Sequence, residues 1–138
     1  MSWQFYAVLA FFLLGSFYTS MKFASAAGIS AELATLILQA SALLTVAFYI
    51  GIKFNSISFQ YNQTSLIYAT IAGILVALGN LAIYYALSSG PISKISPITG
   101  IAVAIPIIFG FVYFNEPINL KMVAGLFLAF ISIFLLTS

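Results

Sequence analysis

Few side chains in this sequence could do acid–base or metal chemistry. The 138 residues include no histidine and no cysteine. The charged residues are Lys22, Glu32, Lys53, Lys94, Glu116 and Lys121. Without imidazole or thiol groups, the sequence excludes disulfides, thiol catalysis and classical zinc sites. Two carboxylates far apart in the sequence, with no glycine-rich phosphate loop, leave no plausible nucleophile–base pair. We therefore expect neither an enzyme nor a bound metal or cofactor.

Polar side chains inside the apolar segments are the other candidates for function. Gln39 and Asn80 each carry a carboxamide, which needs a hydrogen-bond partner in hydrocarbon. That partner is either a neighbouring helix or a transported solute, and the sequence leaves both open. Lys22 is either a helix-end anchor or a cavity group, and the hydroxyl-bearing candidates either pack helices or line a path. The substrate-path candidates are Lys22, Gln39, Asn80, Tyr84, Ser96 and Thr99.

Two prolines lie where a membrane helix should be unbroken, at Pro97 and Pro106. Proline removes a backbone hydrogen bond and clashes with the preceding turn. It thereby frees the carbonyl four residues earlier, and a membrane bundle must satisfy that carbonyl in another way. We interpret both prolines as shape determinants that form a bend or hinge for gating. Glu116 closes the same segment, and we interpret it as a helix-end acid in preference to a proton-coupling carboxylate.

The elements that must position these residues are five apolar helices. The chain is 64% hydrophobic and 4% charged, with a mean hydropathy of +1.20, whereas about a quarter of the residues in soluble domains are charged. Runs of about 20 apolar residues are long enough to cross a bilayer as helices. The predicted helices span residues 3–26, 31–52, 65–87, 91–114 and 120–136. The sequence predicts an all-α integral membrane protein with a single domain over residues 1–138. Ser30 and Asn119 are the predicted N-caps of the second and fifth helices.

The lysines give no preferred orientation for the five predicted spans. Lys22 and Lys94 fall on the side opposite the N-terminus, whereas Lys53 and Lys121 fall on its own side. Orientation normally follows an excess of lysine and arginine in the cytoplasmic loops. Either the insertion machinery or a partner orients the chain, or both orientations are made and pair antiparallel (dual topology). The net charge of +2 is too small to indicate nucleic acid as a partner.

The sequence resembles the EamA-type repeat of the drug/metabolite transporter superfamily. The features that match, in order, are Gly15-Ser16, Met21-Lys22, Tyr-Tyr-Ala-Leu at 84–87, the small-residue turn at 88–91, Pro97, Pro106, Glu116 and Gly125. The resemblance covers nearly the whole chain, because one such repeat is itself five helices. Two features depart from the family pattern. Gln39 or its neighbours stand where the family often has an arginine, and the sequence holds one repeat where typical members hold two.

The resemblance implies one unit of an inverted-repeat secondary transporter in the plasma membrane. Such a transporter would move a small metabolite or drug-like solute by alternating access, with helices one to four around the path and the fifth outside. The second unit would come from an antiparallel homodimer or from a paralogous five-helix partner. Two alternatives remain. A small multidrug resistance-like exporter would have four helices and an acid in its first helix, which residues 9–21 lack. The other alternative is a non-transporting scaffold or accessory subunit.

Overall fold

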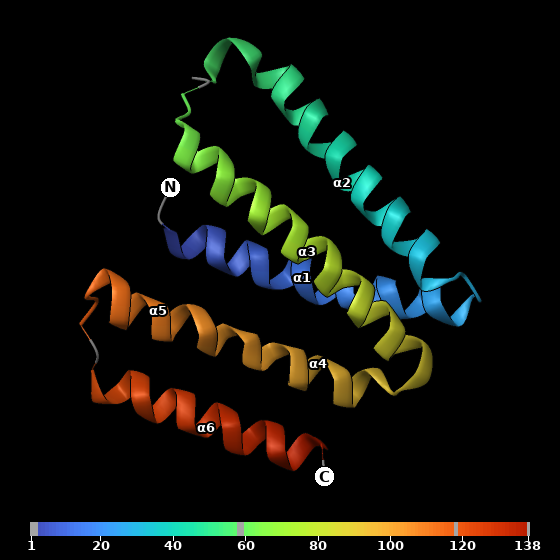
Figure 1. Ribbon diagram of the computed structural model, residues 1–138. Helices are drawn as coiled ribbons and strands as arrows, with labels where there is room; N and C mark the ends of the chain where they lie inside the picture. Colours follow the sequence, from blue (N-terminus) through green and yellow to red (C-terminus); the bar gives the residue numbers. More distant parts are fainter. Residues whose placement is uncertain (1–2, 58–59, 118, 138) are drawn as a thin grey trace. The chain divides into compact units, whose positions relative to one another are not determined.

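A computed structural model describes residues 3–57, 60–117 and 119–137, and every regular element in these residues is a helix (Figure 1). The α-helices are α1 (Trp3–Ala26), α2 (Ala31–Lys53), α3 (Gln63–Ser89), α4 (Ile92–Gly100), α5 (Ala104–Phe114) and α6 (Leu120–Thr137). Two short 3₁₀ segments join them, η1 (Phe54–Ser56) and η2 (Ile101–Val103). Because α4, η2 and α5 follow one another without a break, they correspond to the single predicted helix 91–114.

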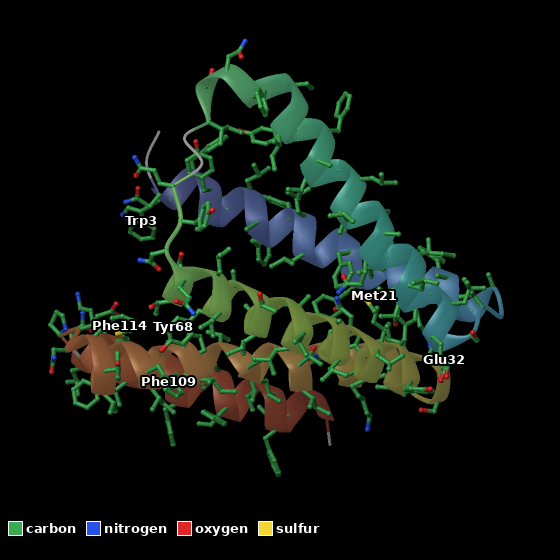
Figure 2. All side chains as sticks on the ribbon, turned by 45° about the horizontal axis from the view of Figure 1, so that its top comes forward. Trp3, Met21, Glu32, Tyr68, Phe109 and Phe114 are labelled. Atoms are coloured by element: carbon green, nitrogen blue, oxygen red, sulfur yellow. The ribbon has the colours of Figure 1, made fainter. Side chains whose placement is uncertain are left out.

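Four helical segments have the length and composition to cross a membrane. They are Trp3–Ala26, Ala31–Ser56, Gln63–Ser89 and Ile92–Phe114, and a shorter apolar helix covers Leu120–Leu136. Most large apolar side chains on these helices point outward (Figure 2). Trp3 is 76% exposed and Phe114 is 70% exposed. Contiguous apolar surface on this scale does not suit a protein in water, but it suits helices that are solvated by lipid.

Side-chain caps fix where several helices begin. The Ser30 hydroxyl accepts from the Leu33 N–H at 3.4 Å, and the Asn119 carboxamide oxygen accepts from the Met122 N–H at 2.8 Å. Both predicted N-caps are therefore present. Asn62 is a third cap, because its side-chain oxygen accepts from the Ser65 N–H at 2.7 Å. The Ser65 hydroxyl in turn accepts from the Asn62 N–H at 3.1 Å, the reciprocal pattern of a capping box. As a result α3 begins at Gln63, two residues before the predicted start.

The path of the chain around Pro106 is altered without being broken. Residues 101–103 form 3₁₀ helix directly before α5, and Pro106 is the third residue of α5. Since Pro106 has no N–H, the carbonyl of Ala102 cannot make its α-helical bond. The Ala104 N–H donates to the carbonyls of Ala102 and Ile101. The backbone angles of Gly100, Ile101 and Val103 stay right-handed helical. The segment tightens locally and continues as one span.

The chain forms two compact units, Met1–Ser89 and Gly90–Ser138. In the first unit, α1, α2 and α3 pack at the end that holds the α1–α2 turn, and α2 diverges from α3 toward Lys53 (Figure 1). The buried side chains of this unit gather at the packed end, and they are Met21, Ala34, Thr35, Tyr84 and Leu87. In the second unit, α4 packs against α6. The buried residues of the second unit are Ala104 and Gly110.

Candidate functional site

A wide-open cavity of about 620 Å³ lies between α1, α2 and α3, beyond the packed end of the first unit. Its lining combines carboxamide and hydroxyl groups with apolar side chains. The lining residues are Leu13, Phe17, Leu38, Gln39, Ser41, Ala42, Thr45, Val46, Val76 and Asn80. We name it the central cavity. Its volume is in the range of small-molecule sites, which is about 300–1,000 Å³. The structure therefore brings together Gln39 and Asn80, the two carboxamides that sequence reasoning selected.

The two carboxamides are not used to join helices. Between the helices of the first unit, the side-chain hydrogen bonds include those from Lys22 to Leu87 and from Tyr85 to Glu32. Within the part of the chain that the structure describes, neither Gln39 nor Asn80 makes such a bond. Both residues are half-buried and line the central cavity. Neither carboxamide bonds another helix of the first unit, and contact with a solute stays a prediction.

Ser41 and Thr45 also line the central cavity, and sequence reasoning missed them. The Ser41 hydroxyl donates to the Leu38 carbonyl at 2.9 Å, and the Thr45 hydroxyl donates to the Ser41 carbonyl at 2.8 Å. A hydroxyl has one proton, so each oxygen faces the cavity as an acceptor only. Their spacing of four residues, which places both on one face of α2, was the available signal.

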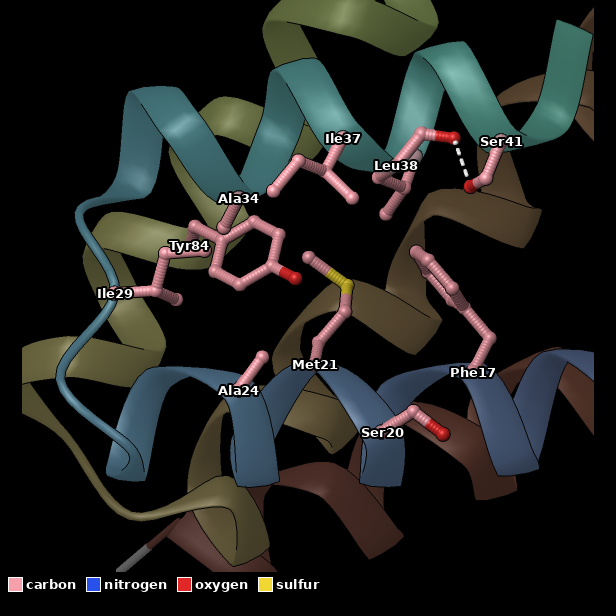
Figure 3. A pocket seen from close by; sticks show the side chains of 10 residues that line it. All are labelled: Phe17, Ser20, Met21, Ala24, Ile29, Ala34, Ile37, Leu38, Ser41 and Tyr84. Atoms are coloured by element: carbon pink, nitrogen blue, oxygen red, sulfur yellow. Dashed lines mark hydrogen bonds between the residues drawn. The ribbon is translucent and has the colours of Figure 1, made fainter.

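Tyr84 lies in a second, smaller cavity of about 280 Å³ at the packed end. Figure 3 shows its ring between Ala34 and Met21, with the hydroxyl pointing toward the Met21 side chain. Phe17, Leu38 and Ser41 line both this cavity and the central cavity. Asn80 and Tyr84, one helical turn apart on α3, therefore serve adjoining spaces. Tyr84 is 5% exposed, so it is also part of the core.

Lys22 ties α1 to the end of α3. Its ammonium group donates to the backbone carbonyl of Leu87 at 2.7 Å, and the contact is partly buried. Leu87 lies in the last turn of α3, where carbonyls lack helical partners and the helix dipole favours a positive charge. Among the two interpretations of Lys22, this contact supports the helix-end anchor. The residue does not line the central cavity.

Glu32 makes a second tie at the same end of the unit. Its carboxylate accepts a hydrogen bond from the hydroxyl of Tyr85, so the first turn of α2 is joined to the last turns of α3. Glu32, Thr35 and Gln39 line one groove of about 340 Å³ between α2 and α3. Gln39 thus borders both this groove and the central cavity. The packed end is held by two polar contacts as well as by its apolar core.

The remaining candidates lie in the second unit. Ser96 and Thr99 are half-buried on α4, and the Thr99 hydroxyl donates to the carbonyls of Ile95 at 3.1 Å and Ser96 at 3.0 Å. Pro97 lies inside α4, and Pro106 follows the 3₁₀ segment η2. None of these residues lines the central cavity, whose walls are α1, α2 and α3.

Glu116 folds back over the end of α5. Asn115 adopts a left-handed conformation with φ 52°, and the N–H groups of Asn115 and Glu116 both donate to the carbonyl of Gly110. A Cβ at Gly110 would lie 2.7 Å from Oε2 of Glu116, which shows how closely the carboxylate covers this buried glycine. Glu116 therefore lies at the C-terminus of α5, and its role as a helix-end acid stays a prediction.

Comparison with known proteins assigns the chain to a family. The model of the EamA-like transporter family matches residues 1–138. The chain belongs to the EamA-like transporter family. The family match confirms the resemblance seen in the sequence and the all-α membrane fold with five helices. With its apolar helices, this family member is a multi-pass integral membrane protein.

A curated relative is similar to part of the chain. An uncharacterized protein of Methanocaldococcus jannaschii is 36% identical over 76 residues, which are 55% of this chain and 56% of the relative. The match thus spans little more than half the length of that relative. No solved structure matches the chain. No group of three or more histidine, cysteine, aspartate or glutamate side chains that could hold a metal ion occurs in the described ranges.

Proposed function

We propose that this EamA-like chain is a subunit of a secondary transporter and that its solute binds in the central cavity. The observation that carries the proposal is the pair of carboxamides, Gln39 and Asn80, that line this cavity without bonding another helix. A polar group in hydrocarbon is costly unless it is hydrogen-bonded. A bound solute supplies the missing partner, and so does water when the cavity is open.

Alternating access is supported by the uneven packing of the first unit. Its core and both polar ties lie at the end that holds the α1–α2 turn, whereas α2 diverges from α3 toward Lys53. A solute would therefore reach the central cavity from the Lys53 end. For release on the other side, the packed end would open and the diverging end would close. The cycle moves a small metabolite or drug-like solute across the plasma membrane.

A second five-helix unit completes the transporter. In inverted-repeat transporters the substrate lies near the midplane, between two units of opposite orientation. The even division of the four lysines between the two sides favours a chain that inserts both ways and pairs antiparallel. A paralogous five-helix partner of fixed opposite orientation would provide the same arrangement. Pro97 and Pro106 serve as the hinge of the span that contains them.

Solute flux into liposomes tests the proposal. Purified protein, alone and with any paralogue, is screened for uptake of a broad panel of radiolabelled metabolites and drug-like solutes. We expect uptake of at least one solute, and at least tenfold slower uptake by the Gln39→Leu, Asn80→Leu double variant, because that variant removes both carboxamides. The matched control is Gln63→Leu, Asn55→Leu, which changes the same residue types at exposed positions outside the central cavity.

Two results would count against this function. One is the absence of any uptake together with stable capture of an unrelated membrane enzyme, which would indicate an accessory subunit. The other is equal uptake by the double variant and the control, which would place the solute elsewhere. Size-exclusion profiles of both variants in detergent show that each is folded before flux is compared.

A further inference from the structure

We infer that the central cavity takes an uncharged solute that carries a hydrogen-bonding group, such as an amide, hydroxyl or carbonyl, on an apolar body. This inference rests on the proposed transport function and names the substrate class of the same site. It follows from three properties of the lining, namely its charge, its balance of hydrogen-bond donors and acceptors, and its apolar wall.

The residues that α1, α2 and α3 contribute to the lining include no ionisable side chain. The charged residues of the first unit's helices either form hydrogen bonds with other residues or lie far from the central cavity. The Lys22 ammonium donates to the Leu87 carbonyl, the Glu32 carboxylate accepts from Tyr85, and Lys53 lies exposed at the far end of α2. Removing an ion from water without an opposite charge costs several kcal/mol, and the cost is high inside a membrane. An ionised solute would therefore bind this cavity poorly.

The polar part of the lining can both donate and accept hydrogen bonds. Each carboxamide of Gln39 and Asn80 offers N–H donors and a carbonyl acceptor. Ser41 and Thr45 add acceptor oxygens, because their protons are bound to backbone carbonyls. This set matches groups that themselves donate and accept, as amides and hydroxyls do. A lipid acyl chain could fill the volume, but it would leave both carboxamides unsatisfied.

The rest of the lining is apolar and indicates the other part of the solute. Leu13 and Phe17 of α1, Val46 of α2 and Val76 of α3 form this wall. Burial of an apolar body against them contributes about 25 cal/mol per Å² of apolar surface. A solute that is polar at one end and apolar at the other would use both parts of the lining at once.

Matched series of small probes test the inference. Hexanamide, hexanoate and hexylamine share one body and differ in charge at pH 7, as do phenylacetamide, phenylacetate and phenethylamine. Each is titrated calorimetrically into detergent-solubilised protein, with empty micelles subtracted. We expect each amide to bind at least about tenfold more tightly than its charged counterparts, because it brings no unpaired charge. The preference should vanish in the Gln39→Leu, Asn80→Leu variant and persist in Gln63→Leu, Asn55→Leu.

A second variant keeps the shape of the site and changes its charge. Asn80→Asp replaces a carboxamide by a carboxylate of similar size, so hexylamine should gain affinity by about tenfold and hexanamide should lose it. This reversal tests the site even if the double leucine variant folds poorly. Failure of the reversal in a folded Asn80→Asp protein whose new carboxylate is ionised would show that the solute does not contact Asn80, and would overturn the inference.

Other outcomes separate this inference from the transport proposal. Equal or tighter binding of a charged probe, or no binding by any probe, overturns the substrate class. If liposomes then take up a charged solute in a Gln39- and Asn80-dependent way, transport stands and the substrate class fails. If amides bind as expected but no solute is moved, the binding class stands and the transport proposal fails. Tightly held lipid that is displaced by none of the probes also overturns the substrate class.

Discussion

At the scale of single residues, substitution of Gly110 tests its close contact with the Glu116 carboxylate. A methyl group at Gly110 would meet the Glu116 carboxylate, with a Cβ-to-Oε2 distance of 2.7 Å. Gly110→Ala should be less stable than Gly125→Ala by about 0.5 kcal/mol, the low end of the range for contacting groups, because the exposed end of the Glu116 side chain can move away. Gly125 is the matched control, since no atom lies within 4 Å of a Cβ built there. The measurement is the free energy of unfolding in mixed detergent micelles.

Removal of the Glu116 carboxylate tests whether Glu116 causes the difference between the two glycine substitutions. In a Glu116→Ala background, Gly110→Ala and Gly125→Ala should have the same effect on the free energy of unfolding. A difference that survives without the carboxylate would show that Gly110 is constrained by something other than Glu116.

Lys22 gives a second prediction at this scale. Lys22→Met should lower the free energy of unfolding by about 1–2 kcal/mol, because it removes a charged donor from the Leu87 carbonyl at a helix C-terminus. Lys53→Met is the control, since Lys53 is exposed at the end of α2 and should matter less. Unfolding in mixed micelles measures both. Equal losses from the two substitutions would argue that the Lys22 contact contributes nothing specific.

Some residues of the candidate site could be predicted from the sequence, and others could not. Gln39 and Asn80 could be selected because a carboxamide in hydrocarbon needs a partner, and the structure puts both on one cavity. Ser41 and Thr45 were missed because hydroxyls in membrane helices commonly bond their own backbone and need no outside partner. The partner of Lys22 is a backbone carbonyl 65 residues away, and every residue type carries such a carbonyl. No sequence pattern therefore identifies the carbonyl that Lys22 contacts.

At the scale of elements, the 3₁₀ segment η2 should depend on Pro106. Pro106→Ala restores an N–H that can donate to the Ala102 carbonyl, so residues 101–103 should become α-helical. Amide hydrogen exchange in residues 102–106 should then slow. Pro91→Ala is the control, because Pro91 precedes α4 and occupies a capping position. Unchanged exchange in Pro106→Ala would indicate that packing in the second unit, and not the proline, produces the 3₁₀ turn.

The start of a helix could be predicted where a capping residue is followed directly by an apolar run. Ser30 and Asn119 each precede an apolar run, and both proved to be caps. The polar residues Gln63 and Thr64 follow Asn62, so the sequence predicts that the helix begins only at residue 65. The Asn62 cap extends α3 into that polar stretch. The positions of Pro97 and Pro106 indicated a disturbed helix, but their effect on the backbone was not readable, since α and 3₁₀ helices differ by a small change in dihedral angles.

At the scale of the whole molecule, dual topology can be tested with added charge. Asn55→Lys with Ser56→Lys places two more lysines beside Lys53, on the side of the N-terminus. These lysines should fix that side in the cytoplasm. If the transporter is an antiparallel homodimer, uptake should then fall to background, since no oppositely oriented copy remains. C-terminal reporters that are active on only one side of the membrane measure the orientation. The neutral pair Asn55→Gln, Ser56→Thr is the control.

Co-expression with an oppositely oriented variant distinguishes the loss of antiparallel pairing from damage to the subunit. Co-expression with a variant carrying Ser88→Lys and Ser89→Lys, biased to the opposite orientation, should restore uptake. A fully oriented population that keeps normal uptake would contradict the antiparallel homodimer. A natural chain that gives signal from only one reporter would remove dual topology and favour a paralogous partner.

Because α2 is packed only near its start, a small rotation there would move its far end by a larger distance. Its buried residues are Ala34 and Thr35, near its start, and the other end is Lys53. With 23 residues and a rise of about 1.5 Å each, α2 is roughly 34 Å long, so a pivot of about 10° at its start would carry the far end through about 6 Å. A side-chain adjustment of an ångström or less around Ala34 and Thr35 is therefore magnified severalfold at the Lys53 end. A bound solute that presses on Gln39, close to the pivot, would have a large mechanical effect for a small local change.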